Sequence, residues 1–223
     1  MKNIFPLMLL LCCLAALFSS CERRFTSRQT VDFNSGWAFH LGDVENGQMP
    51  DYDDADWRRL NVPHDWSIEG EFSKDHPATP GGGALPGGIG WYRKTFALPS
   101  DAARLVFIDF DGVYMNSSVW INGHLLGHRP YGYISFRYEL TPYLNYGATN
   151  VLAVRVDNSQ QPNSRWYSGS GIYRNVRLVK TSTMHVDHWG TFVTAPAVSD
   201  SLAALRVRTM IVNAADKVRA IRL

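Results

Sequence analysis

Cysteine is scarce in this sequence and is confined to its first residues. All three cysteines, Cys12, Cys13 and Cys21, lie at the start of the 223-residue chain. The rest of the chain therefore has no disulfide, no cysteine metal ligand and no cysteine nucleophile. A chain of this length can nevertheless bury enough apolar surface to fold without disulfides.

Clustered charge is also lacking. The formal net charge is +2, and the charged residues are scattered without long runs of one sign. A nucleic-acid-binding surface needs clustered Lys and Arg, so this class of partner is excluded. The seven tryptophans, by contrast, suit β structure and contact with carbohydrate.

The one long apolar run lies at the N-terminus and is too short to cross a bilayer. It covers Ile4–Phe18 after the positive Lys2, whereas a spanning helix needs about 20 residues. Phe18-Ser-Ser-Cys21 resembles a bacterial lipobox, with Phe where Leu is usual. We predict a signal peptide over residues 1–20, a linker over 21–30 and an exported protein. Lipidation of Cys21 would anchor the protein to a membrane without a membrane-spanning helix, in the periplasm or at the outer membrane or cell surface. Ordinary cleavage of the signal peptide, without lipidation, is the alternative.

A long 3.6-residue apolar period is absent after residue 25. Short alternating runs are separated by Gly, Pro, Asn and Asp, which predicts an all-β, antiparallel sandwich. Asn122-Gly123 predicts a type I′ hairpin turn, Thr141-Pro142 predicts one helical turn, and a turn at 53–57 should deliver Trp57 to the core. The predicted strands cover residues 36–41, 58–62, 91–98, 104–110, 115–121, 124–128, 134–139, 151–156, 172–179, 190–194 and 205–212. The predicted core includes Trp37, Trp57, Trp91 and Trp120.

A new strand pattern begins after about residue 182. Leu205, Val207 and Ile211 alternate with basic residues, and a further strand is expected over 218–223. An immunoglobulin-like sandwich needs about 100 residues, and only about forty remain. We therefore expect residues 183–223 to be the truncated start of a second domain.

Familiar catalytic and metal motifs are missing. The glycine-rich segment 80–90 lacks the G-K-[ST] ending of a phosphate loop, so it is either a plain connector or a loop whose backbone approaches a ligand. His64 and Asp65 are adjacent on an extended segment and should point to opposite faces, which favours a structural role for His64. His185 and His188 flank Asp187 without a third ligand, so no metal site is predicted. No carboxylate pair suitable for acid–base catalysis is apparent.

The polar loop within Asp157–Arg174 is the strongest functional candidate. It joins two strands yet carries Arg165, Trp166 and Tyr167, which no packing requirement explains. A flat apolar ring beside fixed hydrogen-bonding groups suits a sugar. The alternative is a tryptophan that caps the edge of the sandwich.

Eight segments in a fixed order now carry a family resemblance. Together they resemble the N-terminal sugar-binding domain of glycoside hydrolase family 2, and look most like the β-galactosidase-type members of the Bacteroidota, over residues 31–182. The segments are Phe33-Asn-Ser-Gly-Trp37, Val62-Pro-His-Asp-Trp66, Gly87-Gly-Ile-Gly-Trp-Tyr-Arg-Lys94, Phe110-Asp-Gly-Val113, Val119-Trp-Ile-Asn-Gly123, Gly127…Gly132…Phe136, Asn150…Val156-Asp-Asn158 and Ser170-Gly-Ile-Tyr-Arg174.

The resemblance implies a jelly-roll (galactose-binding-like) sandwich followed by an immunoglobulin-like domain. It also implies that two Glu of a later (β/α)8 barrel perform retaining hydrolysis, so that no catalytic residue lies in this chain and the chain alone hydrolyses nothing. The implied function is the sugar-binding part of an exported retaining β-glycosidase, foremost a β-galactosidase, in carbohydrate degradation. A free-standing glycan-binding lipoprotein without hydrolase activity is the alternative.

The resemblance also implies the substrate-binding residues, namely Asp157, Asn158, Arg165 and Trp166. Asp157 has an alternative role as a turn residue bonded to its own backbone, and Gly87 stands where some members have a contacting Asn. The implied partners are a β-linked oligosaccharide or glycan and the protein's own barrel, with a homo-oligomer also compatible. No cofactor is expected in this chain, although Na⁺ or Mg²⁺ is an option in the full-length enzyme.

Overall fold

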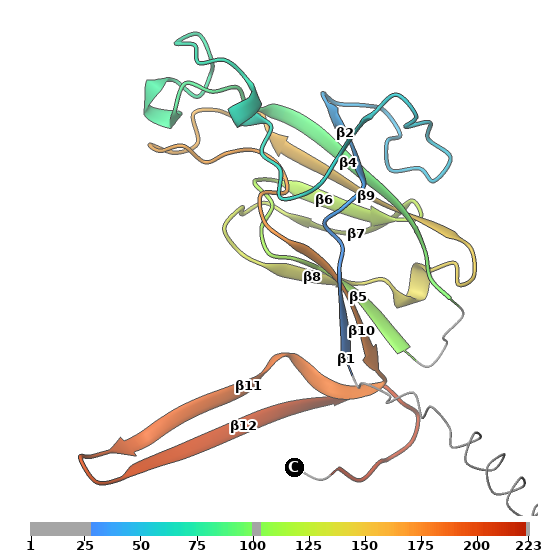
Figure 1. Cartoon of the computed structure of the whole chain (residues 1–223), viewed down its shortest axis with the longest axis vertical. Coiled ribbons are helices and arrows are strands. Elements are labelled where there is room, and N and C mark those ends of the chain that lie inside the picture. Colours follow the sequence, from blue (N-terminus) through green and yellow to red (C-terminus); the bar gives the residue numbers. More distant parts are fainter. Residues whose placement is uncertain (1–27, 100–103, 222–223) are drawn as a thin grey trace, which may run out of the picture.

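The computed structural model describes residues 28–99 and 104–221, and within them the fold is all-β (Figure 1). The predicted signal peptide and Cys21 lie outside the described residues. Three short 3-10 helices, Ser67–Glu69, Pro80–Gly82 and Thr141–Tyr143, connect strands. The last of these is the helical turn predicted from Thr141-Pro142.

Two antiparallel sheets form a sandwich. The smaller has the order β1 (Arg28–Asp32), β10 (Val176–Ser182), β5 (Arg104–Phe110) and β8 (Phe136–Glu139). The larger has the order β3 (Arg58–Leu60), β2 (Trp37–Leu41), β4 (Gly88–Ala97), β9 (Thr149–Asn158), β6 (Ser117–Ile121) and β7 (His124–Arg129). Every pairing in these two sheets is antiparallel, which confirms the predicted fold class.

The core lies between the two sheets. In β5, Val106, Ile108 and Phe110 are buried while their neighbours are less so, as a half-buried strand requires. They pack in one cluster with residues of the larger sheet such as Ile121 and Val154. Apolar side chains from both sheets therefore build one continuous core.

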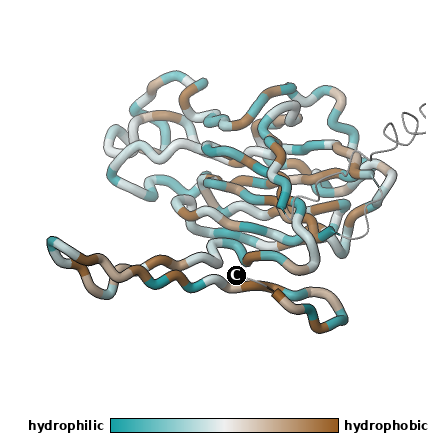
Figure 2. Tube along the Cα trace, turned by 60° about the horizontal axis from the view of Figure 1, so that its bottom comes forward, coloured by the Kyte–Doolittle hydropathy of each residue, from teal (hydrophilic) through white to brown (hydrophobic). Residues whose placement is uncertain are grey.

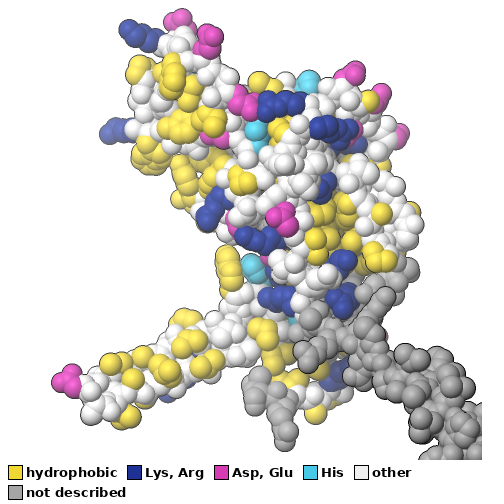
Figure 3. All heavy atoms as spheres, in the orientation of Figure 1, with side chains coloured by type: hydrophobic (Ala, Val, Ile, Leu, Met, Phe, Trp, Pro, Cys, Tyr) yellow, Lys and Arg dark blue, Asp and Glu magenta, His cyan; other side chains and the backbone are white. Residues whose placement is uncertain are grey.

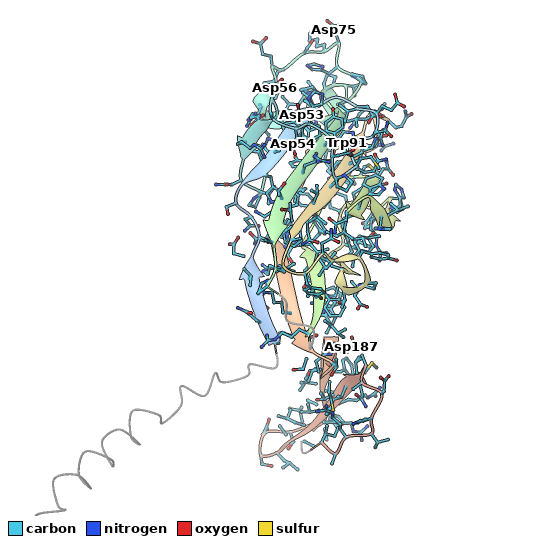
Figure 4. The ribbon with its side chains drawn as sticks, turned by 90° about the vertical axis from the view of Figure 1, so that its right-hand side faces the viewer. Asp53, Asp54, Asp56, Asp75, Trp91 and Asp187 are labelled. Atoms are coloured by element: carbon cyan, nitrogen blue, oxygen red, sulfur yellow. The ribbon has the colours of Figure 1, made fainter. Side chains whose placement is uncertain are left out.

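The larger sheet is also covered on its outer face. The segment between β2 and β3 carries Trp57, which packs with Trp91 in a second cluster and is 7% exposed. Trp120 stacks on Trp91 with ring centroids 5.5 Å apart and is only partly buried. Figure 4 shows Asp53, Asp54 and Asp56 of this segment at the same end of the molecule as Trp91. The prediction that the turn delivers Trp57 to a core is confirmed.

The Asn122-Gly123 turn forms as predicted. Asn122 has φ 50° and Gly123 φ 82° between β6 and β7, which is the pair of positive angles that a type I′ turn needs. Asn122 also receives the Val151 N–H on its side-chain oxygen, at 2.9 Å. The turn residue thus ties the hairpin to the neighbouring strand β9.

Several strand boundaries differ from the predictions. β1 begins at Arg28 and pairs with β10, so the predicted linker over 21–30 overlaps a strand. β10 begins at Val176 rather than at residue 172. No strand covers residues 218–221 within the described chain, so the strand predicted over 218–223 is wrong there. Val218 and Ile221 are exposed, and no strand of the described residues pairs with this segment.

The last strands form a separate hairpin. β11 (Met184–Val198) pairs with β12 (Ala203–Asn213) as a two-stranded sheet that extends from the sandwich (Figure 1). Hydrophobic and hydrophilic residues alternate along it (Figure 2), and most of its residues are exposed. Strands were predicted here, and the immunoglobulin-like domain stays a prediction. None of the described helices is long and apolar enough to cross a membrane.

Candidate functional site

Three loops gather on one side of the sandwich. They cover residues 62–87, 130–135 and 159–171 (Figure 1). Hydrogen bonds join them: Ser67 Oγ donates to Ser170 Oγ at 2.7 Å, and the Trp166 indole donates to the Tyr133 hydroxyl at 2.9 Å. Hydrophobic side chains collect over this side in Figure 3. The loops are therefore a joined surface rather than separate connectors.

The predicted residue Asp157 is the last but one of β9 and lies on the outward face of the strand. Its Oδ1 accepts hydrogen bonds from the Ser159 N–H at 3.0 Å and the Ser159 hydroxyl at 2.6 Å, and its Oδ2 accepts one from Arg155 at 3.2 Å. Burial raises its pKa, but the bonds from Ser159 and the charge of Arg155 outweigh burial and lower the pKa overall. Asp157 is thus a charged turn residue, and its carboxylate keeps one of about four acceptor positions unused.

Asn158 lies on the opposite face of the strand and is buried. Its amide nitrogen donates to the Gly169 carbonyl at 2.9 Å and to Ser170 Oγ at 2.8 Å. Its amide oxygen accepts from Gln161 at 2.8 Å and from Asn163 at 2.7 Å. Because all four hydrogen-bonding positions are filled, Asn158 holds the loop in place and has none left for a sugar hydroxyl.

Trp166 projects from this loop into solvent. Its side chain is 60% exposed, so it does not cap the sandwich edge. Its indole N–H donates to the Tyr133 hydroxyl at 2.9 Å, and Tyr133 meets Tyr131 edge-on at 5.6 Å. Tyr131 and Tyr133 were not predicted as site residues, because only the fold brings loop 130–135 to loop 159–171. Together they fix the orientation of the exposed indole.

Arg165 is exposed next to Trp166. Within residues 28–99 and 104–221 it takes part in no hydrogen bond or ion pair. A guanidinium carries five N–H donors. All of them are free to bind a ligand.

Asp65 connects loop 62–87 to loop 159–171 through hydrogen bonds. Its Oδ1 accepts from the backbone N–H of Ser67 at 3.0 Å and of Ser170 at 2.8 Å, and its Oδ2 accepts from the Tyr167 hydroxyl. Burial and this carboxylate raise the pKa of Tyr167. Gly83 packs so closely on Tyr167 that a Cβ there would lie 3.0 Å from its ring. The glycine-rich segment therefore supports the Tyr167 side of the loop.

His64 points away from Asp65, as predicted. Its Nδ1 lies 2.7 Å from the Tyr92 hydroxyl and its ring 4.6 Å from that of Phe39. Burial lowers its pKa, against the opposing influence of Glu69. A buried imidazole packed against core aromatics, with its Nε2 3.3 Å from Glu69 Oε1, is structural, and no hydrogen bond connects it to Asp65 among the described residues.

The comparisons with known proteins agree with this architecture. The family described as "Glycosyl hydrolases family 2, sugar binding domain" matches residues 31–182. A beta-galactosidase of Bacteroides ovatus is 60% identical over 190 residues, which cover 85% of this chain and 22% of that protein. A putative beta-glucuronidase of Formosa agariphila is 46% identical over 188 residues, or 84% of this chain and 18% of that protein.

The fold agrees as well. The crystal structure of a beta-glycosidase from Bacteroides vulgatus superposes with a TM-score of 0.81 at 46% identity, over 85% of this chain and 25% of that one. The chain thus spans about a fifth to a quarter of the length of these relatives.

Proposed function

The chain belongs to glycosyl hydrolase family 2, and from that premise we propose that it is the N-terminal sugar-binding part of an exported retaining β-glycosidase that degrades carbohydrates. Galactosides are the proposed substrates, because the relative that is 60% identical is a beta-galactosidase. The single observation that carries the sugar-binding role is Trp166, a tryptophan 60% exposed on a loop whose hydrogen bonds fix it in place.

The loop residues take separate roles in this proposal. The Trp166 ring stacks on the C–H face of a sugar, as aromatic rings do in mostly apolar ligand sites. Arg165 supplies free N–H donors, and the remaining acceptor position of Asp157 receives a hydroxyl. Asn158 is a positioning residue. In this proposal, catalysis is performed by two Glu of a barrel in the longer protein. Binding of Na⁺ or Mg²⁺ is proposed only for that longer protein.

The test compares two substitutions at the turn in the longer enzyme. Asp157→Ala should raise KM for a chromogenic β-galactoside by roughly 10- to 100-fold, the worth of a hydrogen bond to a charged group. Ser159→Ala is the matched control, because it removes a turn hydrogen bond but leaves the carboxylate. Equal KM values for both variants would show that Asp157 is only a turn residue.

A second measurement separates the two candidate functions. We expect the DNA after the Leu223 codon to continue in frame into a barrel, and the pure 223-residue chain to hydrolyse no chromogenic β-galactoside above a heat-treated control. A stop codon together with measurable sugar affinity would favour the free-standing glycan-binding lipoprotein. The exposed Trp166 and unpaired Arg165 are compatible with that alternative too.

Export and lipidation are proposed on the leader sequence alone. Labelling cells with a radioactive fatty acid should mark the wild-type protein and not Cys21→Ser. Label on the Cys21→Ser variant would contradict lipidation at Cys21.

A further inference from the structure

Asp157 shares its arginine partner with a second carboxylate. Arg155 and Asp157 are two residues apart on β9, so strand alternation places both side chains on the outer face of the larger sheet. The second carboxylate is Asp43, in the segment that follows β2. Arg155 donates to Asp43 through Nε at 2.9 Å and one Nη at 2.7 Å, and to Asp157 Oδ2 through its other Nη at 3.2 Å. The guanidinium thus gives two short bonds to Asp43 and one longer bond to Asp157.

Asp43 is held in place by groups other than Arg155. Its Oδ1 also accepts hydrogen bonds from the Trp91 indole at 2.8 Å and from the Val44 N–H at 3.1 Å. Gly42, just before it, donates its N–H to the Ile89 carbonyl at 2.7 Å. Trp91 is 3% exposed and belongs to β4, between β2 and β9. The Asp43 carboxylate is therefore a fixed acceptor beside the sheet.

A buried arginine holds the rest of this segment against the sheet. Arg93 of β4 is 2% exposed and donates to the backbone carbonyls of Gly47 at 2.5 Å and Met49 at 2.9 Å. Its Nε donates to Asp54 Oδ2 at 2.8 Å. Because these contacts are independent of Arg155, the segment that carries Asp43 stays in place whichever way the Arg155 side chain turns.

The acceptor position left on Asp157 lies on the oxygen that Arg155 already binds. Oδ1 accepts both hydrogen bonds from Ser159, and Oδ2 accepts the single bond from Arg155. A guanidinium beside a carboxylate favours two bonds to it over one. If Asp43 did not hold two N–H groups of Arg155, a second one would be free to turn to Oδ2 and fill its remaining position. Asp43 thus competes with Asp157 for the donors of Arg155.

We propose that Asp43 is a positioning residue for the sugar site: by holding two N–H groups of Arg155, it leaves Oδ2 of Asp157 with an acceptor position for a sugar hydroxyl. This inference rests on the proposed function, in which Asp157 contacts the sugar. Asp43 lies outside the three loops at 62–87, 130–135 and 159–171 and acts through Arg155. The segment between β2 and β3 then takes part in sugar binding without touching the sugar.

The test measures KM and kcat of the longer enzyme for a chromogenic β-galactoside. Asp43→Ala should raise KM about three- to tenfold with kcat unchanged, because one ordinary hydrogen bond from Arg155 then competes with the sugar hydroxyl. The double variant Asp43→Ala/Arg155→Met should return KM to that of Arg155→Met alone, since it lacks the competing donors. Arg59→Met is the matched control: it breaks the pair of Arg59 with Asp54, 3.0 Å apart, in the same segment and should leave KM unchanged.

A crystal structure of the Asp43→Ala chain shows the cause directly. Two N–H groups of Arg155 should then lie within about 2.7–3.2 Å of the Asp157 carboxylate, in place of the single one in the wild type. An Arg155 side chain that turns away from Asp157 in this variant would overturn the proposal.

The kinetic outcomes separate this inference from the proposed function. A wild-type KM in Asp43→Ala, together with a raised KM in Asp157→Ala, would refute the role of Asp43 and leave the sugar contact of Asp157 intact. A double variant with a KM no lower than that of Asp43→Ala would also refute it, because a merely structural defect is not repaired by a second substitution in the same network. A wild-type KM in Asp157→Ala would refute the sugar contact, and this inference with it.

Discussion

Replacing Asn158 with alanine should release the Trp166 loop without unfolding the domain. The substitution removes four hydrogen bonds. Gln161 and Asn163 can bond to water instead, and the Ser170 hydroxyl keeps its bond from Ser67 Oγ. The Gly169 carbonyl, by contrast, is left unpaired in a buried position. At about 1–3 kcal/mol for one unsatisfied buried group, Asn158→Ala should cost about 1–3 kcal/mol. Domains of this kind have about 5–15 kcal/mol of stability.

Urea unfolding measures this cost. With an m value of about 2–3 kcal/mol/M, the midpoint should fall by about 1 M. Hydrogen exchange of the backbone amides in residues 161–170 should accelerate while that of β4 does not. Gln161→Ala is the control, since it removes one half-buried donor to Asn158 and should shift the midpoint much less. Equal midpoints for the two variants would refute the role of Asn158 as the centre of the loop.

Three further predictions concern stability. Arg93→Met should cost about 3–5 kcal/mol in chemical unfolding, because Arg93 is 2% exposed and its loss leaves Asp54 without its buried partner; a loss below about 1 kcal/mol would contradict this. Gly87→Ala should lower the thermal midpoint by the equivalent of about 1–3 kcal/mol, since a Cβ there would lie 2.5 Å from the Asn158 carbonyl oxygen; an unchanged midpoint would show that the loop yields freely. A hydrogen bond from Arg155 lowers the pKa of Asp43 from 3.8 to about 2. The contribution of Asp43 to stability is therefore present above pH 3.8 and is lost as the pH falls through 2. Asp43→Asn should flatten the pH dependence of the unfolding free energy between these values, and an unchanged pH dependence would show that Asp43 makes no such contribution.

Local signals in the sequence account for most of the sandwich. β5 has the bounds predicted from its alternation, and the Asn-Gly turn formed between the two predicted strands. β1 was missed because Arg28-Gln-Thr-Val-Asp32 has no apolar alternation and forms an exposed edge strand. Its partner strand, β10, lies far along the chain, with Arg28 opposite Thr181. A pattern within a few residues cannot predict a pairing over such a distance in sequence.

The candidate site was predicted in part. An exposed tryptophan in a polar loop could be inferred, but its support by Tyr133 could not, because the two residues lie 33 positions apart. Asn158 was grouped with Asp157 as a contact, although strand parity separates them. Val154 and Val156 face the core, so Asn158 must follow them inward while Asp157 faces out. The positive φ of Trp189 was not predicted, although Gly190 follows it directly and glycine within a strand often marks a bulge.

The pairing of β1 with β10 has a mechanical consequence. Because Arg28 and Thr181 face each other across that pair, the segment that begins the sandwich and the segment that ends it lie next to each other. The sandwich can therefore be spliced into another chain as a closed unit, as domains with adjacent ends tolerate. A pulling force applied at Arg28 and Thr181 would act first on the pairing of β1 with β10 and would break its hydrogen bonds one after another. The ten-residue pairing of β4 with β9 would bear no force at that stage.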